Sequence, residues 1–234
     1  MADAFDRYRT NLGERLSGIT DQKEIAMVRK LPTGIDVLDR MLEGGIPAGS
    51  VVVLTANPAS QVELILYELT AARRTLYLTT MRSEAAVQDA LDRVNTRVGQ
   101  PNIQELAADA PLDHANQQIR MLPEESNLII DPLDPLEEAP RARYQHFLNT
   151  LQTHMINTES VAFLHATSGR REPEQRDTSE YMADVVFQLE TSVRGDAVVN
   201  RLTVPKFRGG RAMDEPIKLE LRERVSIDTS RDIA

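Results

Sequence analysis

Eight residues between an apolar stretch and a helix-like stretch occupy the place of a phosphate-binding loop. A loop of the pattern GxxxxGK[ST] uses two glycines to let backbone N–H groups close on phosphates, a lysine to neutralise them and a hydroxyl to hold magnesium. Those four places are filled here by Ala56, Gln61, Val62 and Glu63. The whole window is Ala56, Asn57, Pro58, Ala59, Ser60, Gln61, Val62 and Glu63.

Glu63 is the substitution that most opposes nucleotide binding. Its carboxylate would stand where the phosphates and their metal belong, and two unit charges about 4 Å apart repel by roughly 4 kcal/mol at an effective dielectric near 20. That repulsion corresponds to about a thousandfold in affinity. The missing glycines also restrict the φ > 0 conformations of a tight phosphate nest. We therefore expect no catalytic residue here, and no ATP or magnesium except at a rearranged or partner-shared site.

The composition offers few other reactive groups. There is no cysteine, which excludes disulfides, thiol nucleophiles and thiolate metal sites, and the four histidines show no metal-ligand spacing. The chain has 234 residues, of which 41% are hydrophobic and 27% charged, as in a folded globular domain. No apolar run reaches the roughly 20 residues of a membrane span. We expect a cytoplasmic protein with neither a metal site nor a membrane partner.

Charge is unevenly distributed along the chain. The formal net charge of −9 opposes general attraction to nucleic acid. Residues 121–138 carry six acids and no lysine or arginine, whereas residues 201–211 carry four basic residues and no acid. These blocks are either two solvated faces or parts of a subunit interface or phosphate-facing arm.

Strand-like and helix-like stretches alternate over the first two thirds of the chain. The β-branched run at 50–55 is typical of a strand buried on both faces, and further strands are predicted at 25–30, 75–80, 102–106, 127–131 and 160–167. Helices are predicted at 36–42, 60–72, 83–96, 114–122 and 137–157. This alternation predicts an α/β fold with right-handed crossovers and a parallel sheet.

The remaining third has a different texture. Residues 168–180 are polar and predict a flexible loop, and four strand-like runs between 183 and 228 leave no room for helices. They predict a C-terminal antiparallel β meander. We therefore expect an N-terminal helical extension at 1–24 that packs on a partner, followed by one domain over 25–234.

The lead-in to the altered loop resembles a known family. Residues 31–39 (LPTGIDVLD) and 44–50 (GGIPAGS) are similar to the run before the phosphate-binding loop in RecA-like ATPases of the KaiC and RadA kind. Residues 128–131 (LIID) resemble their Walker B strand, and residues 206–210 (KFRGG) resemble their KxRG segment. The texture is similar to that of archaeal, in particular haloarchaeal, members. The resemblance implies a RecA-like three-layer αβα core with a mainly parallel sheet.

The resemblance also implies which chemistry is missing. The KaiC kind has a pair of glutamates after the strand that follows the loop's helix, one of which polarises the attacking water. Aligning residues 76–80 with that strand places Met81 and Arg82 there. The general base is therefore predicted to be absent as well, unless a shifted register brings in Glu84.

Two residues of the family's site keep a chemically competent type. Asp131 stands at the Walker B place, where it would orient magnesium, but a buried strand-end carboxylate is the structural alternative. His165 ends the next strand, where the family has a polar sensor of the γ-phosphate, and the alternative is a hydrogen-bonded strand-end histidine.

The basic C-terminal block gives the remaining candidates. Lys206 and Arg208 are two apart on a strand and should share a face, and in the KaiC kind this pair reaches the neighbouring subunit's γ-phosphate. With Arg211 they form a candidate trans-acting or interface set, comparable to an arginine finger. The alternative is a pair of exposed basic residues on an edge strand.

Three functions remain open from the sequence. The first is a catalytically degenerate regulatory or partner subunit in a homo- or hetero-oligomer with RecA- or KaiC-like subunits. The second is a divergent ATP-binding enzyme whose Asp131, Glu63 or Glu84 holds a metal. The third is a nucleic-acid-binding protein in recombination, repair or transcriptional or signal regulation, which would use Arg170, Arg171, Arg176 and residues 201–211, although no aromatic residue in the 168–180 loop offers stacking.

Overall fold

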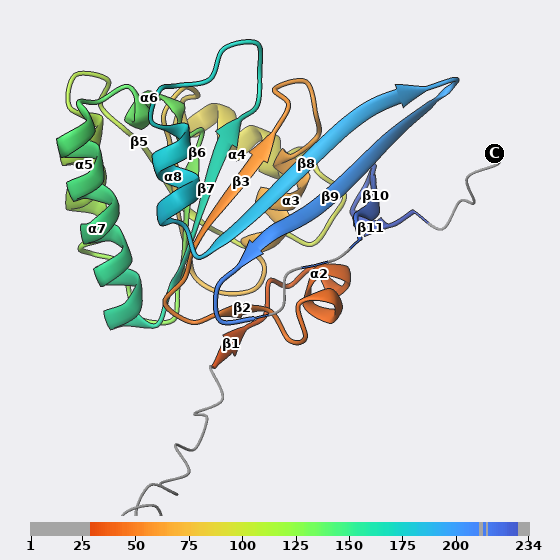
Figure 1. Cartoon of the computed structure of the whole chain (residues 1–234), viewed down its shortest axis with the longest axis horizontal. Coiled ribbons are helices and arrows are strands. Elements are labelled where there is room, and N and C mark those ends of the chain that lie inside the picture. The colour runs from red at the N-terminus through yellow and green to blue at the C-terminus, as the bar shows by residue number, and fades with distance from the viewer. Residues whose placement is uncertain (1–28, 211–212, 214, 229–234) are drawn as a thin grey trace, which may run out of the picture.

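A computed structural model describes residues 29–210, 213 and 215–228 of the chain (Figure 1). The predicted N-terminal extension at 1–24 and Arg211 lie outside these residues. The predicted strand at 25–30 falls there too, except for its end, because β1 covers Lys30–Leu31. Within the described residues, no helix is both long and apolar enough to cross a membrane.

Nine strands form one sheet in the order β11-β10-β9-β8-β3-β7-β6-β4-β5. Strands β5, β4, β6, β7, β3 and β8 run parallel, and β9, β10 and β11 add to β8 as an antiparallel meander. The prediction of a mainly parallel sheet with a C-terminal meander is thus confirmed. The strands are β3 (Val51–Ala56), β4 (Thr75–Thr79), β5 (Asn102–Glu105), β6 (Asn127–Asp131), β7 (Val161–Thr167), β8 (Val185–Arg194), β9 (Ala197–Phe207), β10 (Ile217–Leu221) and β11 (Val225–Ile227).

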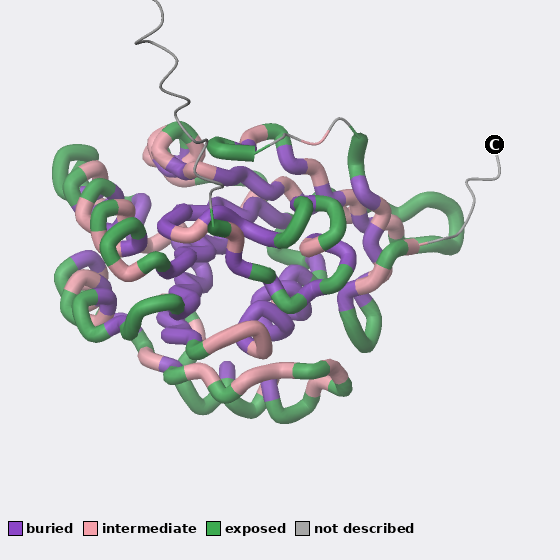
Figure 2. The backbone as a smooth tube through the Cα atoms, turned by 90° about the horizontal axis from the view of Figure 1, so that it is seen from below, coloured by how far each residue is buried: buried purple, intermediate pink, exposed green. Residues whose placement is uncertain are grey.

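Helices cover both faces of the parallel part, so the core has three layers (Figures 1 and 2). Alternate residues of β3 enter different cores: Val52 and Leu54 pack with α3, and Val51 and Val53 with α7. This two-sided burial explains why β3 is apolar throughout. The helices are α2 (Asp36–Met41), α3 (Glu63–Leu69), α4 (Glu84–Arg93), α5 (Pro111–Ile119), α6 (Asp134–Glu137), α7 (Arg141–Thr158) and α8 (Arg176–Met182).

The lead-in segment is fixed by one carboxylate. Asp39 Oδ1 accepts hydrogen bonds from Thr33 N at 2.6 Å and Thr33 Oγ1 at 2.8 Å, and Asp39 Oδ2 accepts one from Gly34 N at 3.1 Å. Gly45 has φ +118°, and a Cβ there would lie 2.2 Å from Leu31 O. The threonine, glycines and aspartate of this motif therefore build the turn that brings β1 against β2 (Ile46–Pro47).

The helix after the altered loop is tied to the C-terminal meander. Glu68 of α3 is buried, and its Oε1 accepts hydrogen bonds from Thr96 Oγ1 at 2.8 Å and from Val225 N at 2.7 Å. Two donors to one buried carboxylate oxygen compensate for its lost hydration. α3 and β11, far apart in sequence, are therefore held together through one buried carboxyl group.

Two predicted elements differ from those found. The helix predicted over 137–157 begins only at Arg141 as α7, and a separate short helix, α6, ends at Glu137, before Pro140. The loop predicted over 168–180 is shorter, because α8 begins at Arg176. Arg176 and Ser179 look like loop residues in the sequence but are buried against Glu137 of α6.

Candidate functional site

The carboxyl ends of four adjacent parallel strands bring the predicted site residues to one edge of the sheet. β3 leads into residues 57–62, β4 leads to Arg82, β6 ends at Asp131 and β7 carries His165 near its end. Ligands of open α/β sheets bind at this edge. The structure therefore assembles in space the altered loop, the Walker B-like aspartate and the candidate sensor.

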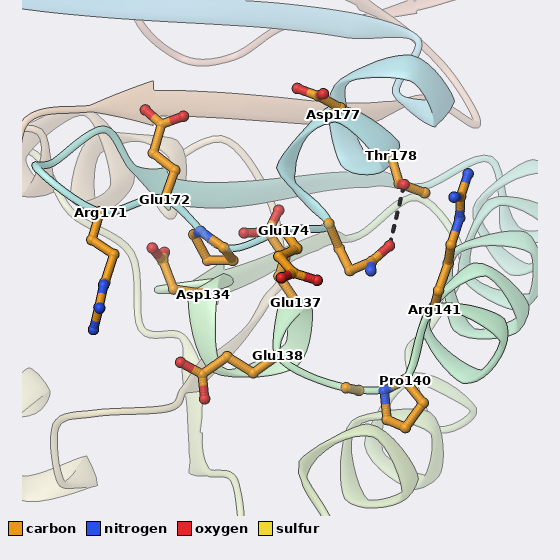
Figure 3. Close-up of a pocket in the computed structure, with 13 residues that line it drawn as sticks. Asp134, Glu137, Glu138, Pro140, Arg141, Arg171, Glu172, Glu174, Asp177 and Thr178 are labelled. Carbon is orange, nitrogen blue, oxygen red and sulfur yellow. Dashed lines mark hydrogen bonds between the residues drawn. The ribbon is translucent and has the colours of Figure 1, made fainter.

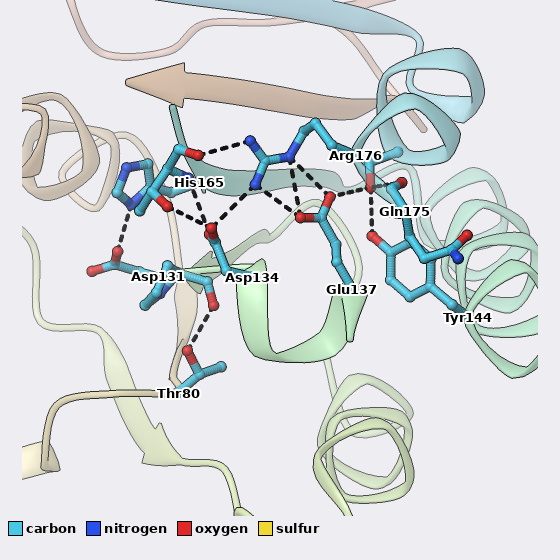
Figure 4. Close-up of polar contacts among 11 residues, drawn as sticks. Thr80, Asp131, Asp134, Glu137, Tyr144, His165, Gln175 and Arg176 are labelled. Atoms are coloured by element: carbon cyan, nitrogen blue, oxygen red, sulfur yellow. Dashed lines mark hydrogen bonds and ion pairs between the residues drawn. The ribbon is translucent and has the colours of Figure 1, made fainter. Parts of the chain in front are cut away.

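Asp131 is buried and bound by two neighbouring strands (Figure 4). His165 Nδ1 lies 2.6 Å from Asp131 Oδ1, and the Tyr77 hydroxyl of β4 donates a hydrogen bond to Asp131 Oδ2. Both carboxylate oxygens thus have a partner within the chain. This is the arrangement of a buried strand-end carboxylate.

Local charge keeps this carboxylate ionised. Burial raises the pKa of Asp131, but hydrogen bonds from His165 and Tyr77 and the positive charge of Arg82 lower it by more, so that the pKa lies below its usual range. Burial, together with the adjacent Asp131, raises the pKa of Tyr77 well above the ordinary value. Tyr77 therefore remains a neutral donor to a negative acceptor.

Arg82 stands close to this pair and is held in place. Arg82 Nη2 donates to Tyr67 Oη at 2.9 Å, and the rings of Tyr67 and Tyr77 are 6.4 Å apart. The backbone of Arg82 is fixed through Thr79 Oγ1, which accepts from Arg82 N at 3.2 Å. The residue aligned with the family's glutamate pair thus brings a positive charge toward Asp131.

His165 is only half satisfied. Its Nδ1 faces Asp131, whereas its Nε2 is buried and has no hydrogen-bond partner in the part of the chain that the structure describes. Because Asp131 is an acceptor, the contact at Nδ1 assigns the proton of a neutral ring to Nδ1.

The altered loop packs on the core and is closed by hydrogen bonds within its own turn, although the buried Ser60 Oγ has no hydrogen-bond partner in the described part of the chain. Val62 is 2% exposed and belongs to the apolar core on the α3 side. Asn57 closes the turn, because its Oδ1 accepts from Ala59 N and its carbonyl from Ser60 N, each at 2.9 Å. No residue of 56–63, all of which are described, has positive φ. The loop therefore lacks the φ > 0 residues of a tight phosphate nest.

The positions of the remaining loop residues follow from this packing. Ala56 is the last residue of β3, and its carbonyl accepts from Ser168 N at 2.7 Å. Pro58 and Gln61 are exposed, Ser60 is buried, and Glu63 is the first residue of α3. The seventh position, where a P-loop has its lysine, is thus occupied by a core side chain.

Glu84, the general base that a shifted register would bring in, lies at the edge strand β5. Glu84 Oε1 accepts a hydrogen bond from Glu105 N at the end of the edge strand β5. Among residues 29–210, 213 and 215–228, no group of three or more His, Asp or Glu side chains is arranged to hold a metal ion.

Lys206 and Arg208 lie away from the altered loop of their own chain. Val186 pairs with Lys206 near the amino end of β8, and Arg208 follows β9 at the same edge. Lys206 Nζ donates to the carbonyls of Glu180 and Tyr181 at 2.8 and 2.7 Å, and Arg208 Nη1 lies 2.9 Å from Asp184 Oδ1. Lys206 is thus held by the end of α8 and Arg208 by Asp184, which precedes β8, and the Arg208 side chain remains 54% exposed.

The acidic block at 121–138 is not one solvated face. Asp131 and Glu137 are buried and bound within the chain. Glu138 lines an open hollow beside α6 and α8, together with Glu174 and Asp177 (Figure 3). The acidic residues of this block therefore lie in three different environments: Asp131 beside His165, Glu137 beside Arg176 and Glu138 at the open hollow. A count of charges does not distinguish them.

Arg176, one of the basic residues proposed to bind nucleic acid, is not available at the surface. Arg176 is 4% exposed, and its guanidinium binds Glu137, Asp134 and the carbonyl of Thr167 (Figure 4). Arg170 and Arg171 are exposed in the preceding loop. Arg176 is therefore a structural residue, because its charge is neutralised inside the chain.

Tyr77 and Tyr67 were not identified from the sequence as site residues. A tyrosine in a buried strand needs a partner for its hydroxyl. Tyr77 pairs with Ile129, two residues before Asp131, so that Tyr77 and Asp131 share a face. That register is the signal that would have found it.

Comparisons with known proteins agree with this architecture. A KaiC-like protein from the hyperthermophilic archaeon Pyrococcus horikoshii OT3 superposes with a TM-score of 0.70 at 15% identity, covering 85% of this chain and 99% of that one. A 71-residue stretch, 28% of this chain, is 38% identical to the DNA repair protein RadA from two strains of Mycobacterium tuberculosis. The chain spans only 15% of the length of those two relatives.

A protein family also matches most of the chain. The match covers residues 30–234, and its description is "Family of unknown function (DUF7125)". The chain belongs to this family and has a RecA-like fold of the KaiC and RadA type.

Proposed function

We propose that this chain is a RecA-like protein without ordinary P-loop ATP hydrolysis that acts as a regulatory or partner subunit of a RecA- or KaiC-like assembly. The observation that carries the proposal is the internal saturation of Asp131. Its two oxygens are bound by His165 and Tyr77, and the positive charge of Arg82 lowers its pKa. An aspartate bound in this way has little capacity left to orient a hydrated magnesium ion.

The loop supports the same conclusion from the phosphate side. Val62 is buried in the core, so that no cation extends from this position toward a phosphate. Glu63 places a carboxylate at the start of α3, where a phosphate would be repelled. The lysine position of a phosphate-binding loop is thus occupied by a packed valine, Val62, and the magnesium-binding position by a carboxylate, Glu63, that repels phosphate.

The basic pair supports a role between subunits. Lys206 and Arg208 lie near the amino edge of the parallel strands, opposite to the edge that carries the altered loop. Arg208 keeps half of its side chain exposed while Asp184 orients it. Its charge is therefore presented to another molecule more readily than to this chain's own loop.

Two measurements test the proposal. Isothermal titration of the purified full chain with ATP and magnesium should show no heat of binding, and micromolar affinity would overturn the loss of the nucleotide site. The ATPase rate of a RecA- or KaiC-like protein from the same organism should change on addition of this chain. That change should be lost in Arg208→Ala and kept in the matched surface variant Arg93→Ala, which lies on α4. Equal rates with and without the chain would remove the regulatory role.

Similarity to a DNA repair protein supports a second candidate, binding of nucleic acid in recombination or repair. The exposed Arg170 and Arg171 are the cations of the 168–175 loop that remain for it. Binding of single-stranded DNA that weakens steeply with salt, and is lost in Arg170→Ala/Arg171→Ala, would favour this candidate. No binding at low salt would remove it.

A further inference from the structure

The hairpin formed by β8 and β9 extends beyond the other strands of the sheet (Figure 1). β3 pairs with β8 as far as Ala56 and Leu189, and β10 pairs with residues 200–202 of β9. Residues 190–199 therefore form an arm in which, among the described strands, β8 and β9 pair only with each other. The edge of β8 on the side where β3 ends is thus open to another strand.

The arm carries an exposed apolar pair. Val193 and Val198 are direct cross-strand partners, and they are 75% and 63% exposed. Period-two alternation puts them on the same face as Leu189 and Leu202, a cross-strand pair that is buried in the core on the α3 side of the sheet. The apolar face of the core thus continues onto the arm, where the described part of the chain leaves it uncovered.

The backbone of β8 offers hydrogen-bonding groups at the open edge. The hairpin closes with the pair Arg194–Ala197 around Gly195 and Asp196. The closing pair of such a two-residue hairpin is hydrogen-bonded, and hydrogen-bonded and non-hydrogen-bonded pairs alternate along an antiparallel ladder. The N–H and C=O groups of Val193 therefore point away from β9, toward the open edge.

The charges on the other face of the arm are complementary to one another. Glu190 and Arg194 are both exposed and share that face with Ser192, which lies midway between them. When two arms run antiparallel with Val193 facing its own copy, Arg194 of one arm lies opposite Ser192 of the other. It is then diagonal to the other arm's Glu190, within reach of a long side chain. Two-fold symmetry forms this contact twice.

We propose that the arm pairs with the arm of a second copy of this chain, β8 against β8, about a two-fold axis at Val193. The pairing aligns Val193 and Val198 of both copies in one row across four strands, and it adds backbone hydrogen bonds at the open edge. An interface of this symmetry is closed, so it produces a dimer and not a filament. The pairing uses none of the residues on which the proposed function depends.

Two single-cysteine variants of the full chain test the register. Because the chain has no cysteine, Val193→Cys introduces the only thiol, and in the dimer it faces its own copy at a Cα–Cα distance of about 5.5 Å. The matched control Val198→Cys changes the other exposed valine, whose two copies lie three strand spacings, roughly 14 Å, apart. That distance is too long for a disulfide.

Mild oxidation followed by non-reducing gel electrophoresis compares the two cysteine variants. Val193→Cys should form a disulfide-linked dimer at least about tenfold faster than Val198→Cys, because only its sulfurs are within bonding reach. Equal rates, or no linked dimer in either variant, would overturn the pairing.

Charge reversal tests the same interface without a cysteine. Arg194→Glu and Glu190→Arg each place like charges against one another in a dimer with itself, and each should raise the dissociation constant measured by sedimentation at least about tenfold. A mixture of the two variants restores both ion pairs, since one chain supplies the acids and the other the bases, and it should dimerise as the unmodified chain does. A mixture of the folded variants that stays monomeric would overturn the proposal, as would an unmodified chain that is monomeric up to about 1 mM. If either charge variant does not fold, the cysteine comparison decides.

Discussion

Arg176 Nη2 lies 2.8 Å from Glu137 Oε2, and both side chains are buried in a network that also contains Asp134, Ser179 and Tyr144. The pair joins α8 to α6, two helices separated in the sequence by the whole of α7 and β7. Burial lowers the pKa of Arg176, but the hydrogen bonds and charge of Glu137 raise it by more. The guanidinium is therefore charged whenever the chain is folded.

Removing one partner of this pair should be strongly destabilising. Arg176→Ala leaves the buried Glu137 carboxylate without its cationic partner, and we expect the free energy of unfolding to fall by about 3–5 kcal/mol. Urea unfolding measures it. The control is Arg171→Ala in the exposed loop, which should stay within about 0.5 kcal/mol of the unmodified chain. Equal stability of the two variants would show that the pair contributes nothing.

Lysine placed at two adjacent loop positions should have opposite outcomes. Val62→Lys buries a charge in the α3 core and should lower the free energy of unfolding by at least about 3 kcal/mol. Gln61→Lys introduces the same side chain at an exposed position and should change it by less than about 0.5 kcal/mol. Thermal or urea unfolding separates the two. If Val62→Lys were as stable as Gln61→Lys and bound ATP, the packed loop would not describe the protein in solution.

The hydrogen bond from Tyr77 to Asp131 should be visible in stability. Tyr77→Phe removes a donor to a charged acceptor, and we expect a loss of about 1.5–3 kcal/mol in the free energy of unfolding. Burial keeps the pKa of Tyr77 high, so Tyr77→Phe should not reduce the phenolate absorbance that the folded protein gains up to pH 11. A smaller absorbance change in the variant would mean that this hydroxyl ionises in the folded state.

Asp131 should make the stability depend on acid pH. Its pKa is depressed in the folded chain and about 3.9 when unfolded, so that the unfolded state binds the extra proton first. The stabilisation is present above about pH 4 and is lost as the pH falls through the folded pKa. Asp131→Asn should therefore show a shallower decline of unfolding free energy below about pH 4. Parallel curves for the two proteins would contradict this assignment.

Much of the fold follows from patterns within single elements. The apolar β-branched run of β3 predicts a strand buried on both faces, and the short spacing after residue 183 predicts the antiparallel meander. The sequence did not predict α8, because Arg176, Ser179 and most of its other residues are polar. The burial of Arg176 and Ser179 depends on Glu137, 39 residues before Arg176, and a local pattern does not contain that pairing.

The sequence predicted where the candidate site lies better than it predicted which residues contact one another there. Asp131 ends β6 and His165 lies near the end of the adjacent strand β7, so their proximity follows from strand order. The role of Arg82 does not follow from the sequence, because a cation at the place of a glutamate indicates only that the general base is missing. The structure adds that its positive charge lowers the pKa of Asp131. The partners of Lys206 likewise come from α8, an element that the sequence did not predict there.

The two hydrogen bonds accepted by Glu68 tie β11, the last described strand, to α3 in the core of the domain. A form of the protein shortened before Val225 would lose the amide that binds Glu68 and leave its carboxylate underpaired in the middle of α3. Damage at the tail would then act on α3, the helix that carries Glu63, although Glu68 and Val225 are 157 residues apart in the sequence. A protease that removes the chain from residue 222 onward would thereby loosen the altered loop without cleaving it.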